Sequence, residues 1–329
     1  MTRLALLAAL CLAAPALSQD SEQATPGSVV AAATPEEWRG IAPEDVLVME
    51  LAPDPAGRPR QVVIQLMPLP FSQPWVENIR ALARSHWWDG TSVYRVVDNF
   101  VTQWGGGEGE GFPPRPLPDG IASPVEPYEI DEPQNLAPPG LPLAYQGDPA
   151  AQSPTTFAGQ KVFRGARSWE YAAFANGFPY SGSMDPHQSK VWPIHCYAHV
   201  GVARDLAPDT GTGAELYAVI GHAPRALDRN IAVVGRVIEG IEHLSTLPRG
   251  TGDAGVYASR AEDTPIISAR LASELPDPPR FEYLASDSAS FARYVEVRAN
   301  RSDSFYQVPA GGVDICAVQV PVRRVAAEG

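Results

Sequence analysis

Residues 89–107, DGTSVYRVVDNFVTQWGGG, read as two short strands that end in a run of three glycines. Arg95 lies in the middle of the first strand, VYRVV. In an alternating strand Val93 and Val97 share its face, while Tyr94 and a valine take the other, so both faces are apolar and the strand is largely buried. A buried guanidinium is costly unless it has a partner. Arg95 therefore either forms a salt bridge at a rim or points into a pocket that receives a ligand.

The acidic balance of the chain limits its partners. The 329 residues carry a formal net charge of −13, and 44% of them are hydrophobic. This length suffices for one large domain or two small ones, and the hydrophobic content is ordinary for a globular core. So negative a chain is not expected to bind nucleic acid, whose phosphates need a basic surface, or an anionic membrane face.

The N-terminal stretch, MTRLALLAALCLAAPALSQD, has the three parts of a secretory signal peptide. Arg3 supplies the positive region, residues 4–14 form an apolar run too short to span a bilayer, and ALS precedes a cleavage site after Ser18. We expect a signal peptide over residues 1–18, a location in the periplasm and no membrane anchor. Residues 19–43, rich in Ala, Pro, Ser and Glu, are expected to form a loose, exposed leader.

Two cysteines remain once Cys11 leaves with the signal peptide. Cys196 and Cys316 are an even number in an oxidising compartment. A disulfide between them and two separate buried thiols both stay open, because geometry decides between them. His195 and His199 flank Cys196 and suggest a metal site, but the spacing is loose and no third ligand is evident. Ordinary packing is therefore favoured, and no metal is expected.

Hydrophobic periodicity predicts many short strands and few helices. The clearest helix is QPWVENIRALARS, residues 73–85, with Pro74 suited to its first turn. Shorter helices are expected at 167–178, at 239–248 before Pro248, and at about 290–300. The strands are expected at residues 46–51, 61–66, 199–205, 214–221, 231–238 and 264–273, besides the two of the opening stretch.

The stretch from residue 112 to 156 is rich in proline and lacks periodicity. It predicts a long irregular insert with, at best, short extended pieces. Many short strands with only two clear helices favour a β-barrel over an alternating α/β fold.

Three motifs resemble, in the family's order, the cyclophilin family of peptidyl-prolyl isomerases. They are PWVENIRAL (74–82), WWDGTSVYRVVDNFVTQWGGG (87–107) and GAELYAVIGHAPRALDRNIAVVGRVIEGIEHLSTL (213–247). The resemblance covers about half of the chain. It implies a mainly β fold, an eight-stranded antiparallel barrel capped by two helices, the second at 239–248.

The resemblance also implies a domain organisation. The signal peptide and leader would precede a cyclophilin-like domain at residues 44–273. This domain would contain the long irregular insert, 108–198. A C-terminal extension, 274–329, would follow it.

The resemblance implies that Arg95, Gln103 and Phe100 form the catalytic centre. Arg95 matches the family's catalytic arginine. As the peptide bond twists, the prolyl nitrogen gains a lone pair, and a fixed N–H donor binds this state better than the planar ones. Gln103 matches a glutamine that binds the substrate backbone and helps to orient the arginine.

Four further residues are implied to bind substrate. Val101, Tyr217 and Leu227 would form, with Phe100, an apolar bed for the proline ring. Glu215 stands where the family has a glutamine. The rim also departs from the family pattern: Ala226 replaces a tryptophan or histidine, and Ile231 replaces a histidine.

The implied function is isomerisation of Xaa-Pro bonds in unfolded or folding exported polypeptides, which assists their folding and needs no cofactor. The rival interpretation is a non-catalytic, proline-recognising binding module or chaperone on the same barrel. An isomerisation assay on a short peptide separates the two.

Overall fold

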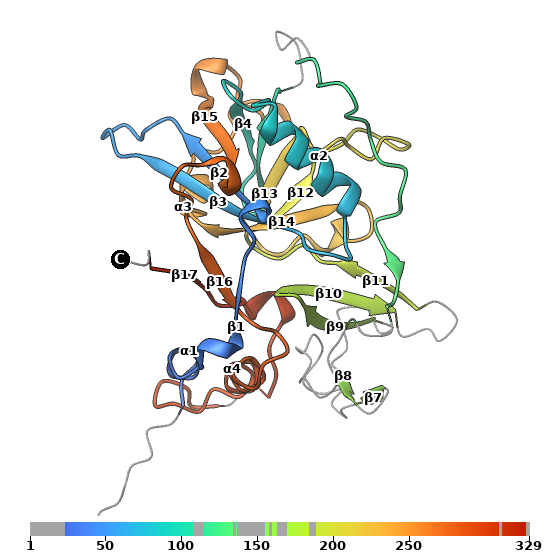
Figure 1. Cartoon of the computed structure of the whole chain (residues 1–329), viewed down its shortest axis with the longest axis vertical. Coiled ribbons are helices and arrows are strands. Elements are labelled where there is room, and N and C mark those ends of the chain that lie inside the picture. Colours follow the sequence, from blue (N-terminus) through green and yellow to red (C-terminus); the bar gives the residue numbers. More distant parts are fainter. Residues whose placement is uncertain are drawn as a thin grey trace, which may run out of the picture.

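The computed structural model describes residues 24–107, 115–133, 136, 155–157, 160–162, 170–183, 189–308 and 311–326. A β-barrel lies at the top of Figure 1, a small sheet lies beneath it, and helices from near both chain ends lie at the bottom. The expected signal peptide, residues 1–18, lies outside the described residues. No helix within the described part is both long and apolar enough to cross a membrane.

Eight antiparallel strands close into the barrel, in the order β12-β13-β5-β4-β15-β2-β3-β14. This confirms the predicted fold class. The strands form from short runs rich in aliphatic and β-branched residues, and their inward side chains, such as Met49, Ile64 and Trp104, are fully buried. The strands are β2 (Val46–Leu51), β3 (Arg60–Leu66), β4 (Ser92–Val96), β5 (Val101–Gly105), β12 (His199–Val202), β13 (Leu216–Val219), β14 (Val233–Glu239) and β15 (Thr264–Leu271).

Helix α2 (Gln73–Arg84) packs against the barrel as its pattern predicts. Pro74 lies in the first turn, where its missing N–H has no intrahelical acceptor to lose. The apolar stripe of α2 belongs to the barrel core: Trp75, Val76, Ile79, Leu82 and Ala83.

The second helix, α3 (Glu242–Ser245), is shorter than the helix expected at 239–248. Strand β14 continues to Glu239, and Gly240 then turns the chain with a φ of +84°. A Cβ on Gly240 would lie 2.0 Å from the carbonyl oxygen of Gln61. Only a glycine therefore allows β14 to end so close to β3, and the helix begins after this turn.

The insert contains a sheet, most of which lies beyond the stretch 112–156 that was expected to be irregular with short extended pieces. Strands β9 (Glu170–Ala175) and β10 (Phe178–Ser183) form a hairpin, and β11 (Lys190–Pro193) joins β10 to β6 (Ile130–Asp131). Two more short strands, β7 (Thr155–Phe157) and β8 (Gln160–Val162), pair with each other.

The helix expected over 167–178 is wrong, because the described part of this segment, residues 170–178, belongs to the hairpin. Asn176 and Gly177 connect its strands with φ values of 49° and 80°. Both values suit a two-residue hairpin turn, for which Asn-Gly is the strongest short signal. The alanines of EYAAFA resemble a helix, but they are small residues on a sheet that is covered on both faces.

One face of the insert sheet packs on the barrel and the other on the chain ends. Tyr171, Phe178 and Tyr180 belong to the core cluster that includes the barrel interior. Phe174 and Trp192 belong to a second cluster with side chains of the C-terminal extension. The sheet is therefore a middle layer, as Figure 1 shows.

The leader and the C-terminal extension fold together, which differs from the loose leader expected over residues 19–43. Helix α1 (Pro26–Ala31) packs on α4 (Ala289–Ala299), and β1 (Trp38–Gly40) pairs with β16 (Phe281–Leu284), whose other neighbour is β17 (Val322–Arg324). The buried anchors are Val29 and Trp38. Their partners lie more than 200 positions later, so local composition could not reveal them. Helix α4 agrees with the one expected at about 290–300.

A disulfide joins Cys196 and Cys316, whose Cα atoms lie 5.0 Å apart. The sequence left open a disulfide or two separate thiols, and the structure contains the disulfide. The bond connects the segment after β11 to the C-terminal extension across a separation of 120 residues.

Candidate active site

Arg95 and Tyr94 converge on the same side chain, which simple alternation did not predict. The pairing of β4 with β5 shifts register between Val93 and Arg95. Such a bulge re-aims successive side chains. Arg95 Nη1 donates to Gln103 Oε1 at 3.0 Å, and Gln103 Nε2 donates to the Tyr94 hydroxyl. The assignment of Tyr94 to the face opposite Arg95 is therefore wrong.

Arg95 is half-buried and is held by neutral oxygens. Its Nε donates to the carbonyl oxygen of Ala254 at 2.8 Å, besides the bond to Gln103. Within the described residues no carboxylate forms a salt bridge with it. Burial lowers the pKa of Arg95, but a guanidinium stays charged in proteins. The rim salt bridge considered from the sequence is thus not what the structure has.

A hydrogen-bonded chain with a fixed direction runs from Arg95 to Glu215. The Tyr94 hydroxyl donates to Glu215 Oε2 at 2.8 Å, and Glu215 Oε1 accepts from the backbone N–H of Gly106 at 2.7 Å. A carboxylate only accepts, so Tyr94 must donate to it and must accept from Gln103 Nε2. The amide oxygen of Gln103 is then the atom that faces Arg95.

The glycine run explains how a carboxylate fits at position 215. Gly105 has a φ of +150°, and a Cβ there would lie 2.2 Å from Glu215 Oε2. The next two glycines direct their N–H groups at Glu215 Oε1. The three glycines therefore leave space for the carboxylate, and two of them donate to it. A side chain at position 105 would fill this space.

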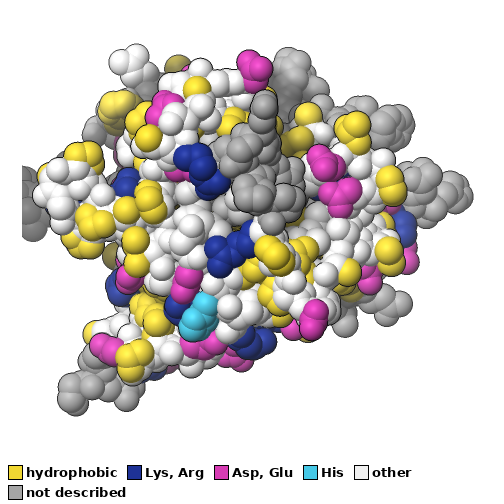
Figure 2. Space-filling view, turned by 90° about the horizontal axis from the view of Figure 1, so that it is seen from above, with side chains coloured by type: hydrophobic (Ala, Val, Ile, Leu, Met, Phe, Trp, Pro, Cys, Tyr) yellow, Lys and Arg dark blue, Asp and Glu magenta, His cyan; other side chains and the backbone are white. Residues whose placement is uncertain are grey.

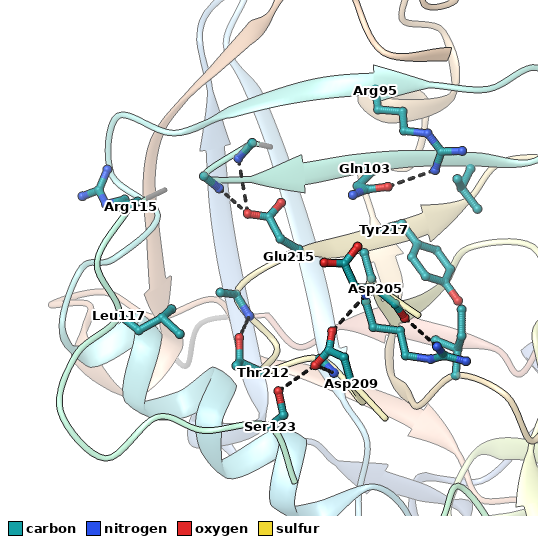
Figure 3. A pocket seen from close by; sticks show the side chains of 18 of the residues that line it. Arg95, Gln103, Arg115, Leu117, Ser123, Asp205, Asp209, Thr212, Glu215 and Tyr217 are labelled. Atoms are coloured by element: carbon teal, nitrogen blue, oxygen red, sulfur yellow. Dashed lines mark hydrogen bonds between the residues drawn. The ribbon is translucent and has the colours of Figure 1, made fainter. Parts of the chain in front are cut away.

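All seven residues predicted for the site line one cavity of about 400 Å³ (Figure 3). Val101 and Tyr217 are buried in one apolar cluster, with Phe100 and Leu227 packed at its edge. The apolar bed thus lies beside Arg95, Gln103 and Glu215 in the same hollow.

Part of the cavity wall comes from residues that sequence reasoning missed. Arg115, Leu117 and Ser123 reach it from the proline-rich insert, as Figure 3 shows. Ser123 donates to Asp209 at 2.9 Å, which holds this stretch against the loop before β13. The irregular stretch has no periodicity in the sequence that could place these residues at the cavity.

The histidines near Cys196 are packing residues. The His199 Nδ1 atom accepts the backbone N–H of Cys196 at 2.8 Å, and burial lowers the pKa of His199 to about 3. His195 contacts Asp228 and Tyr217, and Cys196 is in the disulfide. Among the described residues no group of three or more His, Cys, Asp or Glu side chains could hold a metal ion.

The closed barrel with an arginine beside an apolar pocket defines a protein of the cyclophilin class. A family model described as "Cyclophilin type peptidyl-prolyl cis-trans isomerase/CLD" matches residues 71–270, more than half of the chain. This chain therefore belongs to the cyclophilin-type peptidyl-prolyl cis-trans isomerases.

One of two similar solved structures supports the fold. Cyclophilin AquaCyp293 from Hirschia baltica is similar with a TM-score of 0.62 and 21% identity, over 93% of this chain and 100% of that one. A cyclophilin type peptidyl-prolyl cis-trans isomerase of Cryptosporidium parvum, solved in the presence of the dipeptide Ala-Pro, matches at 10% identity and a TM-score of 0.35, over 71% of this chain and 98% of that one. A search of curated proteins finds no match.

Proposed function

We propose that this isomerase accelerates rotation about Xaa-Pro bonds with Arg95 as the donor to the prolyl nitrogen. One observation carries the proposal: the Arg95 guanidinium and the apolar bed of Phe100, Val101, Tyr217 and Leu227 line the same cavity. A proline ring placed on this bed has its nitrogen within the reach of a guanidinium.

The chemistry needs one well-placed donor. Rotation about a peptide bond costs about 18–20 kcal/mol, because resonance must be broken. The twisted prolyl nitrogen has a lone pair that the planar states lack, so a donor directed at it binds the twisted state better. Each tenfold in rate needs only about 1.4 kcal/mol.

Arg95 is well prepared for this role. A guanidinium has five N–H donors. Within the described part of the chain only two of them are used, by Ala254 and Gln103. These two bonds fix the plane of the guanidinium, while the other donors remain for the substrate. Gln103 therefore acts as a positioning residue for Arg95.

The substrate class follows from the same site. An apolar bed for a proline ring suits unfolded or proline-containing polypeptides. We propose exported polypeptides in the periplasm as the clients, with assistance to folding as the role. The signal-like N-terminal stretch supports this location. Mass spectrometry of the native protein should find Gln19 as the first residue, and an intact Met1 would contradict export.

The proposal is tested by Arg95→Ala with Arg95→Lys as the matched control. We expect Arg95→Ala to lose roughly 100-fold in kcat/KM, because the donor acts mainly in the twisted state. Arg95→Lys keeps the charge without the planar fork and should recover only part of the loss. A short proline peptide followed by NMR exchange gives the rate, and circular dichroism checks the fold.

The same NMR titration tests the rival binding module. A wild-type protein that binds the peptide without accelerating exchange would contradict the enzymatic proposal and support pure recognition.

A further inference from the structure

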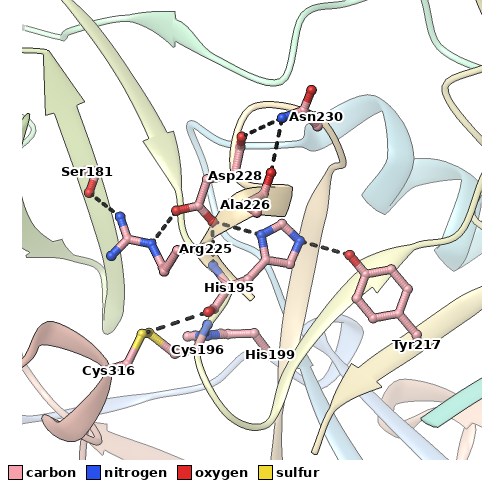
Figure 4. A network of polar contacts seen from close by, with 10 residues as sticks. All are labelled: Ser181, His195, Cys196, His199, Tyr217, Arg225, Ala226, Asp228, Asn230 and Cys316. Atoms are coloured by element: carbon pink, nitrogen blue, oxygen red, sulfur yellow. Dashed lines mark hydrogen bonds and ion pairs between the residues drawn. A yellow bond between two sulfur atoms is a disulfide. The ribbon is translucent and has the colours of Figure 1, made fainter. Parts of the chain in front are cut away.

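A second polar network lies under the prolyl pocket and is almost completely buried (Figure 4). His195 Nε2 lies 2.9 Å from the hydroxyl oxygen of Tyr217, and His195 Nδ1 lies 2.9 Å from Asp228 Oδ1. The His195 side chain is 0% exposed and that of Asp228 is 6% exposed. Neither residue lines the cavity itself.

The direction of these hydrogen bonds follows from the carboxylate. Asp228 Oδ1 also accepts a hydrogen bond from the backbone N–H of His195 at 2.9 Å. This carboxylate oxygen is therefore the acceptor in both of its hydrogen bonds with His195. His195 Nδ1 must therefore carry a proton. In the neutral tautomer Nε2 is then an acceptor, and the Tyr217 hydroxyl donates to it.

The fold makes room for this hydroxyl. A Cβ on Gly201, the residue that pairs with Tyr217 across β12 and β13, would lie 2.3 Å from the Tyr217 hydroxyl oxygen. Position 217 matches a phenylalanine in the cyclophilin motif. A tyrosine fits here because position 201 is glycine and His195 supplies a hydrogen-bond partner.

The same network holds the opposite apolar wall. Arg225, Leu227 and Asp228 belong to one short turn, and Arg225 Nε donates to Asp228 Oδ2. Arg225 Nη2 donates to the hydroxyl of Ser181 on β10 at 2.9 Å. A buried strand of the insert is thereby connected to the turn that carries Leu227.

A second contact ties the same turn to the insert sheet. The Arg229 guanidinium lies 4.7 Å from the ring centre of Trp192 on β11. Its Nε donates to Glu129, next to β6, at 2.6 Å. Strands β10 and β11 of the insert sheet, and the residue before β6, therefore hold this turn and its next residue at the pocket.

We propose that His195 and Asp228 are positioning residues that fix the Tyr217 and Leu227 walls of the prolyl pocket, and that the insert sheet braces the pocket through them. Without His195 the Tyr217 hydroxyl lacks its buried acceptor. A buried unpaired hydroxyl is costly, so the ring turns toward the open cavity, where water can solvate it. The ring then obstructs the place of the proline. This inference rests on the proposed isomerase function.

The test is a mutant cycle between His195→Asn and Tyr217→Phe. The asparagine keeps an N–H donor for Asp228 but is too short to reach Tyr217. We expect His195→Asn to raise KM and to lower kcat/KM roughly tenfold. Adding Tyr217→Phe removes the hydroxyl that needs a partner, so it should restore most of the activity. A residue that only stabilises the fold would not be rescued in this way.

Three outcomes overturn the proposal: a folded His195→Asn protein with wild-type KM and kcat, a double variant no better than His195→Asn, or equal losses in both backgrounds. If His195→Asn does not fold, Arg225→Met replaces it, since this change leaves His195 and Tyr217 in place. We then expect KM to rise roughly threefold. If Arg225→Met folds and its kinetics are unchanged, the insert sheet does not position the pocket. An inactive wild-type protein would instead contradict the isomerase function, so the two failures are distinguishable.

Discussion

Two polar networks, one ending at Glu215 just before β13 and the other at Tyr217 on β13, differ in how completely their hydrogen bonds are satisfied. Glu215 and Tyr217 are two residues apart and so lie on one face of the chain. The network of Glu215 leads through Tyr94 and Gln103 to Arg95, which is half-buried and keeps donors for a ligand. The network of Tyr217 leads through His195 to Asp228 and is enclosed.

This difference separates two kinds of polar group. A network open to a cavity is free to exchange a hydrogen bond with a substrate, so changes in it should alter activity more than stability. An enclosed network exposes its partners to no water, so losing one partner should cost stability. Figure 2 shows that the outer surface, seen from above, has basic and acidic side chains interspersed.

The largest expected effect concerns the disulfide next to the enclosed network, since Cys196 directly follows His195. Replacing Cys196 and Cys316 by serine should lower the free energy of unfolding by roughly 4 kcal/mol, because the bond closes a long loop. Urea unfolding of the double variant measures it, with reduced wild type as the matched control. A loss below about 1 kcal/mol would show that packing alone holds the extension.

The next effect concerns the carboxylate of the buried network. Asp228→Ala removes the acceptor of His195 Nδ1 and one of the acceptors of Arg225, and should cost about 3 kcal/mol of stability. Thermal and urea unfolding give the value. Asp263→Ala, which removes a partly buried carboxylate far from this network, is the comparison. If both variants lose the same free energy of unfolding, the burial of Asp228 adds nothing to its contribution to stability.

A smaller effect depends on pH. The pKa of His199 is lowered to about 3, chiefly by burial and then by the charge of Arg236, whereas an unfolded histidine titrates at about 6.5. The unfolded state therefore binds the proton first, so this stability is complete above pH 6.5 and is lost as pH falls toward 3. Between pH 7 and pH 5 the loss should be about 2 kcal/mol.

The matched variant for the pH prediction is His199→Asn, which keeps an acceptor for the Cys196 N–H and does not titrate. Unfolding at both pH values should show a weaker dependence in this variant. An identical pH dependence in the two proteins would mean that other groups cause it.

The smallest effect belongs to the open side. Glu215→Gln leaves one oxygen to accept from both Gly106 and Tyr94, so the direction of the chain to Gln103 is no longer fixed. We expect about a fivefold loss in kcat/KM with little change in stability. Tyr94→Phe should give a similar loss, and the two should not add. Fully additive losses would contradict a shared chain.

The sequence predicted the barrel and the centre of the site well because both depend on local patterns. The stripe of α2 and the strand at residues 46–51 are readable from periodicity, and Arg95, Phe100 and Gln103 share one motif. The motif resemblance, rather than spacing, brought in Tyr217 and Leu227. All of them line the cavity.

What failed depends on distant partners or on backbone detail. The bulge at Arg95 turns the Tyr94 side chain to the side opposite the one expected. The Asn-Gly turn at 176–177 was missed because the alanines before it favour a helix. Trp38 seemed exposed because its cover, in the C-terminal extension, follows more than 200 residues later. His195 was expected to be a packing residue, since nothing local in the sequence shows that Asp228 and Tyr217 converge on it.

The layered position of the insert sheet has a consequence for how the chain is made. During synthesis strands β9, β10 and β11 appear well before α4. Until α4 is made, the apolar face that includes Phe174 and Trp192 is uncovered. Cys196 likewise waits for Cys316, close to the last residue. A chain cut short after the barrel would keep Arg95 and the cavity but carry a permanently exposed apolar layer. The C-terminal extension thus covers an apolar layer that would otherwise be open to association with other chains.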